Sequence, residues 1–151
     1  MSELIERVYV VTLTIPDNEA YTALTTLARI GLPVDAAVRS DVWIATVDAQ
    51  QVTALDGTIG TIETIYNPNK HRLEIRSDTK PRPGEVWITV HDETPAITVA
   101  GRTVPGLQGI VRRTAWRLLD ERGADVPAGI LDRATESFLC NPAFQKAIRF
   151  R

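Results

Sequence analysis

Apolar positions in the first part of the chain follow two successive periods. Over Val8 to Ile15, one face holds Tyr9, Val11, Leu13 and Ile15 and the other holds Thr12 and Thr14, which predicts a strand with one well-buried side. Pro16 ends this strand, and Asp17 is a good N-cap for a helix. The apolar residues of that helix recur at helical spacing: Tyr21, Leu24, Leu27 and Ala28. Because Gly31 follows them, the pattern predicts a strand and then a helix that ends there.

The residues that follow predict the remainder of a small antiparallel sheet. Residues 34–47 are too long for one strand, so we expect a hairpin with a tight turn at Arg39-Ser40-Asp41. A short helix is expected over Ala49 to Leu55. Two further strands are expected over Thr61 to Tyr66 and Lys70 to Arg76. The resulting order, β-α-β-β-α-β with a trailing strand, is that of a ferredoxin-like antiparallel sheet covered by two helices.

Residues 77–84 are the best linker in the chain, because prolines, a glycine and basic residues occur together there. They divide the chain into a ferredoxin-like domain, 1–76, and an extension, 85–151. The extension begins with an alternating pattern over Glu85 to His91, which predicts a strand. A small hairpin that turns at Ala100-Gly101 is expected next.

Two to three helices are expected from residue 107 onward. A stripe of apolar residues at helical spacing runs toward Gly123: Leu107, Ile110, Val111, Thr114, Ala115, Leu118 and Leu119. Asp125 is expected to cap a second helix, with these residues inward: Ile130, Leu131, Ala134 and Phe138. Asn141-Pro142 predicts the start of a last short helix. Because short helices alone offer a marginal core, we expect them to pack back onto the N-terminal domain.

Composition and charge narrow the class of protein. The chain has 151 residues, of which 44% are hydrophobic and 24% charged, enough for a compact core without disulfides or metals. Its single cysteine, Cys140, excludes an internal disulfide and favours the cytoplasm. With neither a signal peptide nor an apolar run of spanning length, no membrane association is expected. The net charge of −2 is unevenly spread: residues 1–65 carry net −6, residues 66–82 net +3, residues 83–101 net −3 and residues 102–151 net +4.

The basic stretch is the first candidate for a binding site. Its cationic and imidazole side chains are Lys70, His71, Arg72, Arg76, Lys80 and Arg82. The stretch follows the Asn67-Pro68-Asn69 turn and borders the linker, so these side chains are expected to be exposed. Lys70, Arg72 and Lys80 would then bind a phosphate or a carboxylate, with Tyr66 as a stacking face. The alternative interpretation is an ordinary solvated surface.

Other chemically capable residues are weaker candidates. His91 and Glu93 point the same way on an extended segment and His71 could complete a metal site, but a polar strand end is the preferred interpretation. Cys140 follows apolar residues and is expected to be buried and structural. The sequence holds no nucleophile elbow, phosphate-binding glycine loop, dinucleotide fingerprint or paired-cysteine motif. We therefore expect no metal and no cofactor, and the absence of these motifs favours a protein that is not an enzyme.

Arginines on the first expected C-terminal helix raise the question of nucleic acid. Arg112, Arg113 and Arg117 would lie with Trp116 on its outer side, as in some helix-turn-helix proteins. Glu121 can pair with Arg117 one turn away, so a self-neutralised surface or a subunit contact is the preferred interpretation. Nucleic-acid binding is not expected, and a sequence pI near 5.7 agrees with this.

Five short segments share the pattern of a known family: Arg7 to Val10, Leu27 to Gly31, Ala37 to Arg39, Val42 to Ile44 and Ile62 to Tyr66. Through them, residues 7–76 resemble the small PurS-type subunit of formylglycinamidine ribonucleotide synthase, an enzyme of purine biosynthesis. The resemblance implies a ferredoxin-like, non-catalytic subunit that dimerises and joins a large synthetase to its glutaminase partner. The sequence has Ser40-Asp41 where the family usually has Gly-Lys, and its C-terminal part has no counterpart in that subunit.

These observations favour a non-catalytic assembly or interaction subunit. It would form a homo-oligomer through its sheet, within a larger enzyme complex, and Trp43 and Trp87 are candidates for aromatic residues buried at the interface. Two alternatives are open. One is an anion- or small-ligand-binding regulatory domain that uses residues 70–82. The other is a small enzyme whose site lies between the sheet and the C-terminal helices.

Overall fold

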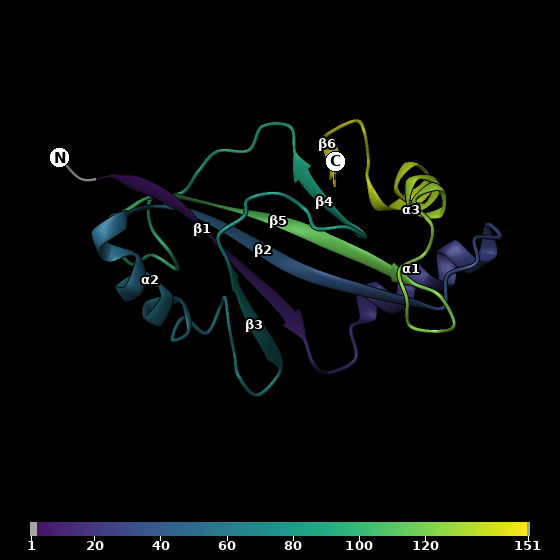
Figure 1. Ribbon diagram of the computed structural model, residues 1–151, viewed down its shortest axis with the longest axis horizontal. Helices are drawn as coiled ribbons and strands as arrows, with labels where there is room; N and C mark the ends of the chain where they lie inside the picture. The colour runs from purple at the N-terminus through teal and green to yellow at the C-terminus, as the bar shows by residue number, and fades with distance from the viewer. Residues whose placement is uncertain (1–2, 151) are drawn as a thin grey trace. The chain divides into compact units, whose positions relative to one another are not determined.

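The computed structural model describes residues 3–150, which form an α+β protein (Figure 1). Six strands are present in this part of the chain: β1 Leu4–Leu13, β2 Ala36–Asp48, β3 His71–Arg76, β4 Glu85–Val90, β5 Leu107–Leu119 and β6 Gln145–Arg149. Three α-helices accompany them: α1 Asn18–Arg29, α2 Val52–Ile59 and α3 Ala128–Ala134. A 3₁₀ turn, Ala49–Gln51, leads into α2, and a π-helical turn, Thr135–Leu139, follows α3. The expected α+β class is confirmed.

The strands form one open antiparallel sheet in the order β3-β1-β2-β5-β4-β6. β3 pairs with β1 in a register that sets His71 opposite Leu13. β4 lies between two partners, so that Trp87 is opposite Ala115 of β5 and opposite Ile148 of β6. β3 and β6 are therefore the two edges of the sheet, and each has backbone groups on one side without a neighbouring strand.

Residue contacts divide the chain into two compact units, each assembled from distant parts of the sequence. Unit 1 comprises the residues up to Ile15, Asp41–Thr79 and Glu93–Arg113. Unit 2 comprises Pro16–Ser40, Lys80–Asp92 and the residues from Thr114 onward. This partition differs from the sequential division into 1–76 and 85–151, because β2 and β5 each contribute residues to both units.

Unit 1 has a core between its strands, α2, the turns after α2 and the hairpin before β5. Its buried members are Tyr9, Val11, Ala45, Val47, Leu55, Ile59, Ile62, Ile65, Val99, Val104, Leu107 and Ile110. The hairpin turns at Ala100 and Gly101, whose φ angles are both positive (51° and 76°). Val99 and Arg102 exchange backbone hydrogen bonds of 3.0 and 2.8 Å around this turn. The predicted turn at Ala100-Gly101 is confirmed.

Unit 2 has its own core, built from α1, β4, β5 and α3. Its buried members are Ala20, Ala23, Leu27, Leu32, Val86, Ile88, Trp116, Leu118, Val126, Leu131, Ala134 and Leu139. Asp17 caps α1 as predicted, since its side chain accepts hydrogen bonds from the backbone N–H groups of Glu19 and Ala20. The buried face of the helix differs from the predicted one, because Tyr21 is 72% exposed and the small residue Ala20 takes its place.

The predicted hairpin over residues 34–47 is wrong, because β2 runs through Arg39-Ser40-Asp41 without a turn. The polar residues that suggested a turn have partners on the extended chain instead. Within unit 2, Arg39 Nε lies 3.2 Å from an Asp17 carboxylate oxygen. Within unit 1, Asp41 accepts a hydrogen bond of 2.9 Å from Arg112. Because these polar side chains have partners, the segment stays extended within β2 and no turn is needed to bring them to solvent.

The predicted strand over Thr61 to Tyr66 is also wrong, because these residues form consecutive turns after α2. Ile62 and Ile65 are three residues apart and both are buried in the core of unit 1. The carbonyl oxygen of Ile62 accepts backbone hydrogen bonds of 2.9 Å from Ile65 and from Tyr66, which closes the turn. The spacing of Ile62 and Ile65 therefore indicates a turn that places both side chains in the core, and not a strand.

The largest correction concerns the expected helix from residue 107, which is the long strand β5. Both faces of β5 are buried near its end: Ala115 lies opposite Trp87, and Trp116 and Leu118 pack in the core of unit 2. A strand buried on both faces shows no clean alternation, so its apolar residues can match helical spacing by coincidence. The β-branched and aromatic residues of this segment favour the extended form.

The C-terminal part also departs from the prediction. Asp125 does not cap a helix; it accepts hydrogen bonds of 2.9 and 3.2 Å from Arg117, and α3 begins after Pro127. The last expected helix is a turn at Asn141-Pro142 followed by β6. Phe138 is 41% exposed, whereas Leu131 and Ala134 are buried as expected.

Two further observations bear on function. Trp87 is completely buried inside its own chain, so it is excluded as an aromatic residue of a subunit interface. None of the helices in residues 3–150 is long and apolar enough to cross a membrane.

Candidate functional site

The structure distributes the predicted anion-binding residues over both compact units. Lys70 ends the turn after Asn67, and Arg72 is an exposed residue of β3, both in unit 1. Lys80 belongs to unit 2. Arg76, which also contributed to the positive stretch, is buried and lies 2.6 Å from a carboxylate oxygen of Glu74. The anion site stays a prediction, and its most exposed part in unit 1 is the pair of Lys70 and Arg72.

The stacking face expected at Tyr66 is partly occupied. Tyr66 is half-buried against the core of unit 1, and its ring centroid lies 6.4 Å from that of His71. His71 Nδ1 accepts a hydrogen bond of 2.9 Å from the backbone N–H of Asn67. His71 therefore stabilises the turn before β3.

The edge strand β3 presents backbone groups that no neighbouring strand uses. The Thr14 N–H donates to the Lys70 carbonyl (2.9 Å), which makes these two residues a hydrogen-bonded pair of the β1–β3 ladder. Such pairs alternate with non-bonded pairs along an antiparallel ladder. Arg72 and Glu74 thus direct their backbone groups toward β1, whereas Leu73 and Ile75 direct theirs away from the sheet.

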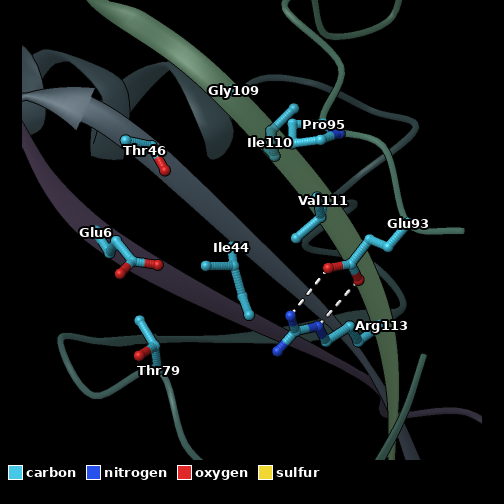
Figure 2. A pocket seen from close by; sticks show the side chains of 10 residues that line it. All are labelled: Glu6, Ile44, Thr46, Thr79, Glu93, Pro95, Gly109, Ile110, Val111 and Arg113. Carbon is cyan, nitrogen blue, oxygen red and sulfur yellow. Dashed lines mark hydrogen bonds and ion pairs between the residues drawn. The ribbon is translucent and has the colours of Figure 1, made fainter. Parts of the chain in front are cut away.

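A pocket of about 260 Å³ opens on unit 1, and its lining comes from three strands and two connecting segments (Figure 2). The lining residues are Glu6, Ile44, Thr46, Thr79, Glu93, Pro95, Gly109, Ile110, Val111 and Arg113. Figure 2 shows Glu6, Thr46 and Thr79 on one side of Ile44, and Arg113 with Glu93 on the other. The floor is apolar and the rim carries charges and hydroxyl groups.

Arg113 is held rigidly at this rim by Glu93. Its Nε and one Nη donate to the two carboxylate oxygens of Glu93 at 3.0 and 2.9 Å, a bidentate ion pair whose side chains are 19% and 21% exposed. The remaining nitrogen, Nη1, makes no hydrogen bond to residues 3–150 and lies on the side away from Glu93 in Figure 2. Arg113 therefore offers one oriented donor to the pocket.

Glu6 supplies the opposite chemistry. It is an exposed residue of β1, and within the described chain its carboxylate has no ion-pair partner. The pocket thus contains one paired and one unpaired carboxylate together with one guanidinium, for a formal charge of −1.

Sequence reasoning placed these residues differently. Arg113 was expected outside a helix, and Glu93 was weighed as a metal ligand with His91 and His71. His91 Nε2 instead lies 3.0 Å from the Pro142 carbonyl oxygen in unit 2. Across residues 3–150, no group of three or more His, Cys, Asp or Glu side chains is placed to hold a metal ion. The alternating spacing of Gly109, Val111 and Arg113 was the signal that could have revealed one wall of the pocket.

A second polar cluster lies inside unit 1, around the buried Tyr9. Its hydroxyl donates to Asp56 at 2.6 Å, and Arg7 donates to the other Asp56 oxygen at 3.2 Å. Burial raises the pKa of the Tyr9 hydroxyl well above its ordinary value, and the hydrogen bond to Asp56 raises it further. The Tyr9 hydroxyl and both Asp56 oxygens have partners, whereas the buried Arg7 Nε has none among the described residues; we assign the cluster a structural role.

Cys140 is half-buried and packs at the border of the core of unit 2. Burial raises the pKa of its thiol. A thiol in this setting is a poor nucleophile, because the reactive form is the thiolate.

Comparison of the chain with known protein families, with curated proteins and with solved structures found no match. Among the described residues, β3 and the pocket are the candidate functional surfaces.

Proposed function

We propose that this protein is a non-catalytic assembly subunit that self-associates by pairing strand β3 of two copies. The observation that carries the proposal is the exposed edge at β3, where Leu73 and Ile75 direct their backbone groups outward and the Ile75 side chain is 43% exposed. Edges of this kind accept a strand from another chain unless they are covered.

The side chains of β3 are self-complementary in one antiparallel register. If two copies of β3 pair with Leu73 at the centre, Arg72 of each copy faces Glu74 of the other, which makes two opposite-charge pairs. Among residues 71–75, moving the register by one step places either Glu74 opposite Glu74 or Arg72 opposite Arg72, depending on the direction. Opposite charges across a strand pair contribute roughly 0.2–1 kcal/mol each, and like charges destabilise it. The charges therefore select the register centred on Leu73.

The resemblance to PurS-type subunits is part of this proposal. The chain begins β1-α1-β2, as a ferredoxin-like domain does, and an open antiparallel sheet leaves edges for assembly. The proposed role is that of a cytoplasmic subunit that dimerises and joins a larger enzyme complex. Because five residues per copy make a small contact, we expect a reversible dimer whose population rises with protein concentration.

Exchange of charges tests the pairing directly. Arg72→Glu alone and Glu74→Arg alone each place like charges opposite one another, so each variant should be monomeric in analytical ultracentrifugation. An equimolar mixture restores two opposite-charge pairs and should contain a mixed dimer. A wild-type protein that stays at 16.7 kDa at high micromolar concentration, or a mixture that stays monomeric, would refute the proposal.

Two proline variants provide a matched control. Ile75→Pro removes an N–H that points away from the sheet, so the fold should survive and the dimer should be lost. Glu74→Pro removes an N–H that points toward β1, so this variant should lose stability as well. Equal dimerisation of Ile75→Pro and the wild type would show that the association uses another surface.

Anion binding is a second candidate function, favoured by one observation. The side chains of Lys70 and Arg72 are exposed, and within residues 3–150 neither forms an ion pair. Single-site binding of phosphate there should be weak and sensitive to salt, because screening acts over roughly 8 Å at physiological ionic strength. Chemical-shift mapping with inorganic phosphate at low salt tests it, with a triple Lys70→Ala, Arg72→Ala, Lys80→Ala variant as the control.

A further inference from the structure

We infer that the pocket of unit 1 binds a small zwitterionic amine of the amino-acid class. This inference concerns a site separate from β3, since no residue of β3 lines the pocket.

The size of the pocket limits the ligand. A volume of about 260 Å³ lies just below the range of roughly 300–1,000 Å³ found for pockets that hold drug-sized molecules. The ligand should therefore be of metabolite size. Pro95 and the alternating residues of β5 form one wall, and Gly109 allows a close approach there, because a Cβ at this position would lie 3.0 Å from the Pro95 Cβ.

The charges determine the ligand's polar ends. Glu6 offers an unpaired carboxylate on one side of Ile44, which suits an ammonium group. Arg113 offers the free Nη1 donor on the other side, which suits a carboxylate. Glu93, whose side chain is 21% exposed, binds the other two guanidinium nitrogens of Arg113. This bidentate pair fixes the orientation of the guanidinium, so its remaining donor points toward the pocket.

The remaining lining determines what lies between those ends. Ile44 and Val111 form an apolar floor between the two polar groups, and Thr46 and Thr79 each contribute a hydroxyl that can donate or accept. The formal charge of −1 disfavours a ligand that is only an anion. An ω-amino acid, whose ammonium and carboxylate lie at the two ends of a short hydrocarbon chain, satisfies all three features: the acceptor, the donor and the floor.

Three probes with one hydrocarbon chain separate these contributions. 6-Aminohexanoate carries the ammonium and the carboxylate at its two ends, pentylamine lacks the carboxylate, and hexanoate lacks the ammonium. In chemical-shift titrations of the full chain at low salt, 6-aminohexanoate should shift the amides of Thr46, Gly109 and Val111 with the lowest Kd. Pentylamine should bind more weakly, and hexanoate should produce no shift at these positions.

The variant Glu6→Gln tests the ammonium end and keeps the side-chain shape. An exposed ion pair contributes up to about 1 kcal/mol, so 6-aminohexanoate binding should weaken about fivefold. Glu63→Gln is the matched control, because Glu63 is an exposed acidic residue of unit 1 outside the pocket, and it should bind as the wild type does.

Arg113→Lys tests the other end. It should weaken the binding of 6-aminohexanoate and leave that of pentylamine unchanged, because only 6-aminohexanoate uses the guanidinium donor. Hexanoate binding as tightly as 6-aminohexanoate, equal affinities of Glu6→Gln and Glu63→Gln, or no shift at these amides with tens of millimolar 6-aminohexanoate would each overturn the inference. Sedimentation measures the dimer and these titrations measure binding in the pocket. The proposed dimerisation through β3 and the proposed ligand site can therefore be refuted independently.

Discussion

Replacing Tyr9 with phenylalanine isolates one buried hydrogen bond in unit 1. The substitution keeps the ring of a fully buried residue and removes the hydroxyl that donates to Asp56 at 2.6 Å. A hydrogen bond to a charged group contributes about 1.5–3 kcal/mol. Asp56 keeps Arg7 as a partner and is 23% exposed, so the lower end applies, and we expect a loss of about 1.5–2 kcal/mol.

The same variant carries a pH signature. Burial and then Asp56 raise the pKa of the Tyr9 hydroxyl above its ordinary value of 10.0, so the unfolded chain loses this proton at a lower pH than the folded chain does. The stabilisation from protonated Tyr9 is thus complete below pH 10 and declines as the pH rises beyond it. The difference in unfolding free energy between wild type and Tyr9→Phe should be constant at neutral pH and shrink above about pH 10.

Urea denaturation at a series of pH values measures both effects. A loss of 1.5–2 kcal/mol corresponds to a fall in Tm of roughly 3–8 °C for a chain of this size. Tyr21→Phe is the control, because Tyr21 is 72% exposed and should change the stability by less than about 0.5 kcal/mol. The reasoning fails if Tyr9→Phe equals this control, or if the gap between wild type and variant does not change on crossing pH 10.

Three further outcomes are expected. Gly106→Ala should lower the free energy of unfolding in urea by about 3 kcal/mol, because the residue has a φ of +78° and the new Cβ would lie 2.5 Å from the Gln51 Cβ. Gly101→Ala is the control and should cost about 1 kcal/mol, because its φ is +76° but open space surrounds it. Asp17→Ala removes the cap of α1 and should cost about 1–2 kcal/mol, with reduced helical circular dichroism. Cys140 should react slowly with a thiol reagent at neutral pH and rapidly in denaturant, because burial raises the pKa of its thiol.

Local rules predicted β1, α1, β3, β4 and the turn of the hairpin before β5. β1, α1 and the turn at Ala100-Gly101 follow from alternation, from the Asp17 cap and from a glycine at positive φ. Each of these signals lies within a few residues of the chain, so the element can be predicted without knowledge of its tertiary contacts. The position of β4 follows from the alternation over Glu85 to His91, and β3 lies within the strand expected over Lys70 to Arg76.

The elements that were missed depend on contacts between distant residues. Arg39 and Asp41 looked like a turn because their partners, Asp17 and Arg112, are far away in sequence. The segment with Ile62 and Ile65 was predicted to be a strand, because no local signal shows that the chain forms turns after α2 that bury both residues. Tertiary pairing decided both segments, and no pattern within a short window contains that information.

The misreading of β5 also concealed the candidate site. On a helix, Arg112 and Arg113 would share one outer surface, and they would suggest a basic face. On a strand, neighbouring side chains point to opposite faces. Arg112 accordingly lies over the Trp43 ring, 5.6 Å from its centroid, whereas Arg113 joins Glu93 in the pocket. Because the side chains of a strand alternate between faces, the two arginines do not form one cationic surface, and each has its own partners. Arg113 keeps one donor that makes no hydrogen bond to the described residues, in the pocket that Glu6 also lines. It is this separation, and not the number of arginines, that makes a zwitterion a better ligand for the site than a polyanion.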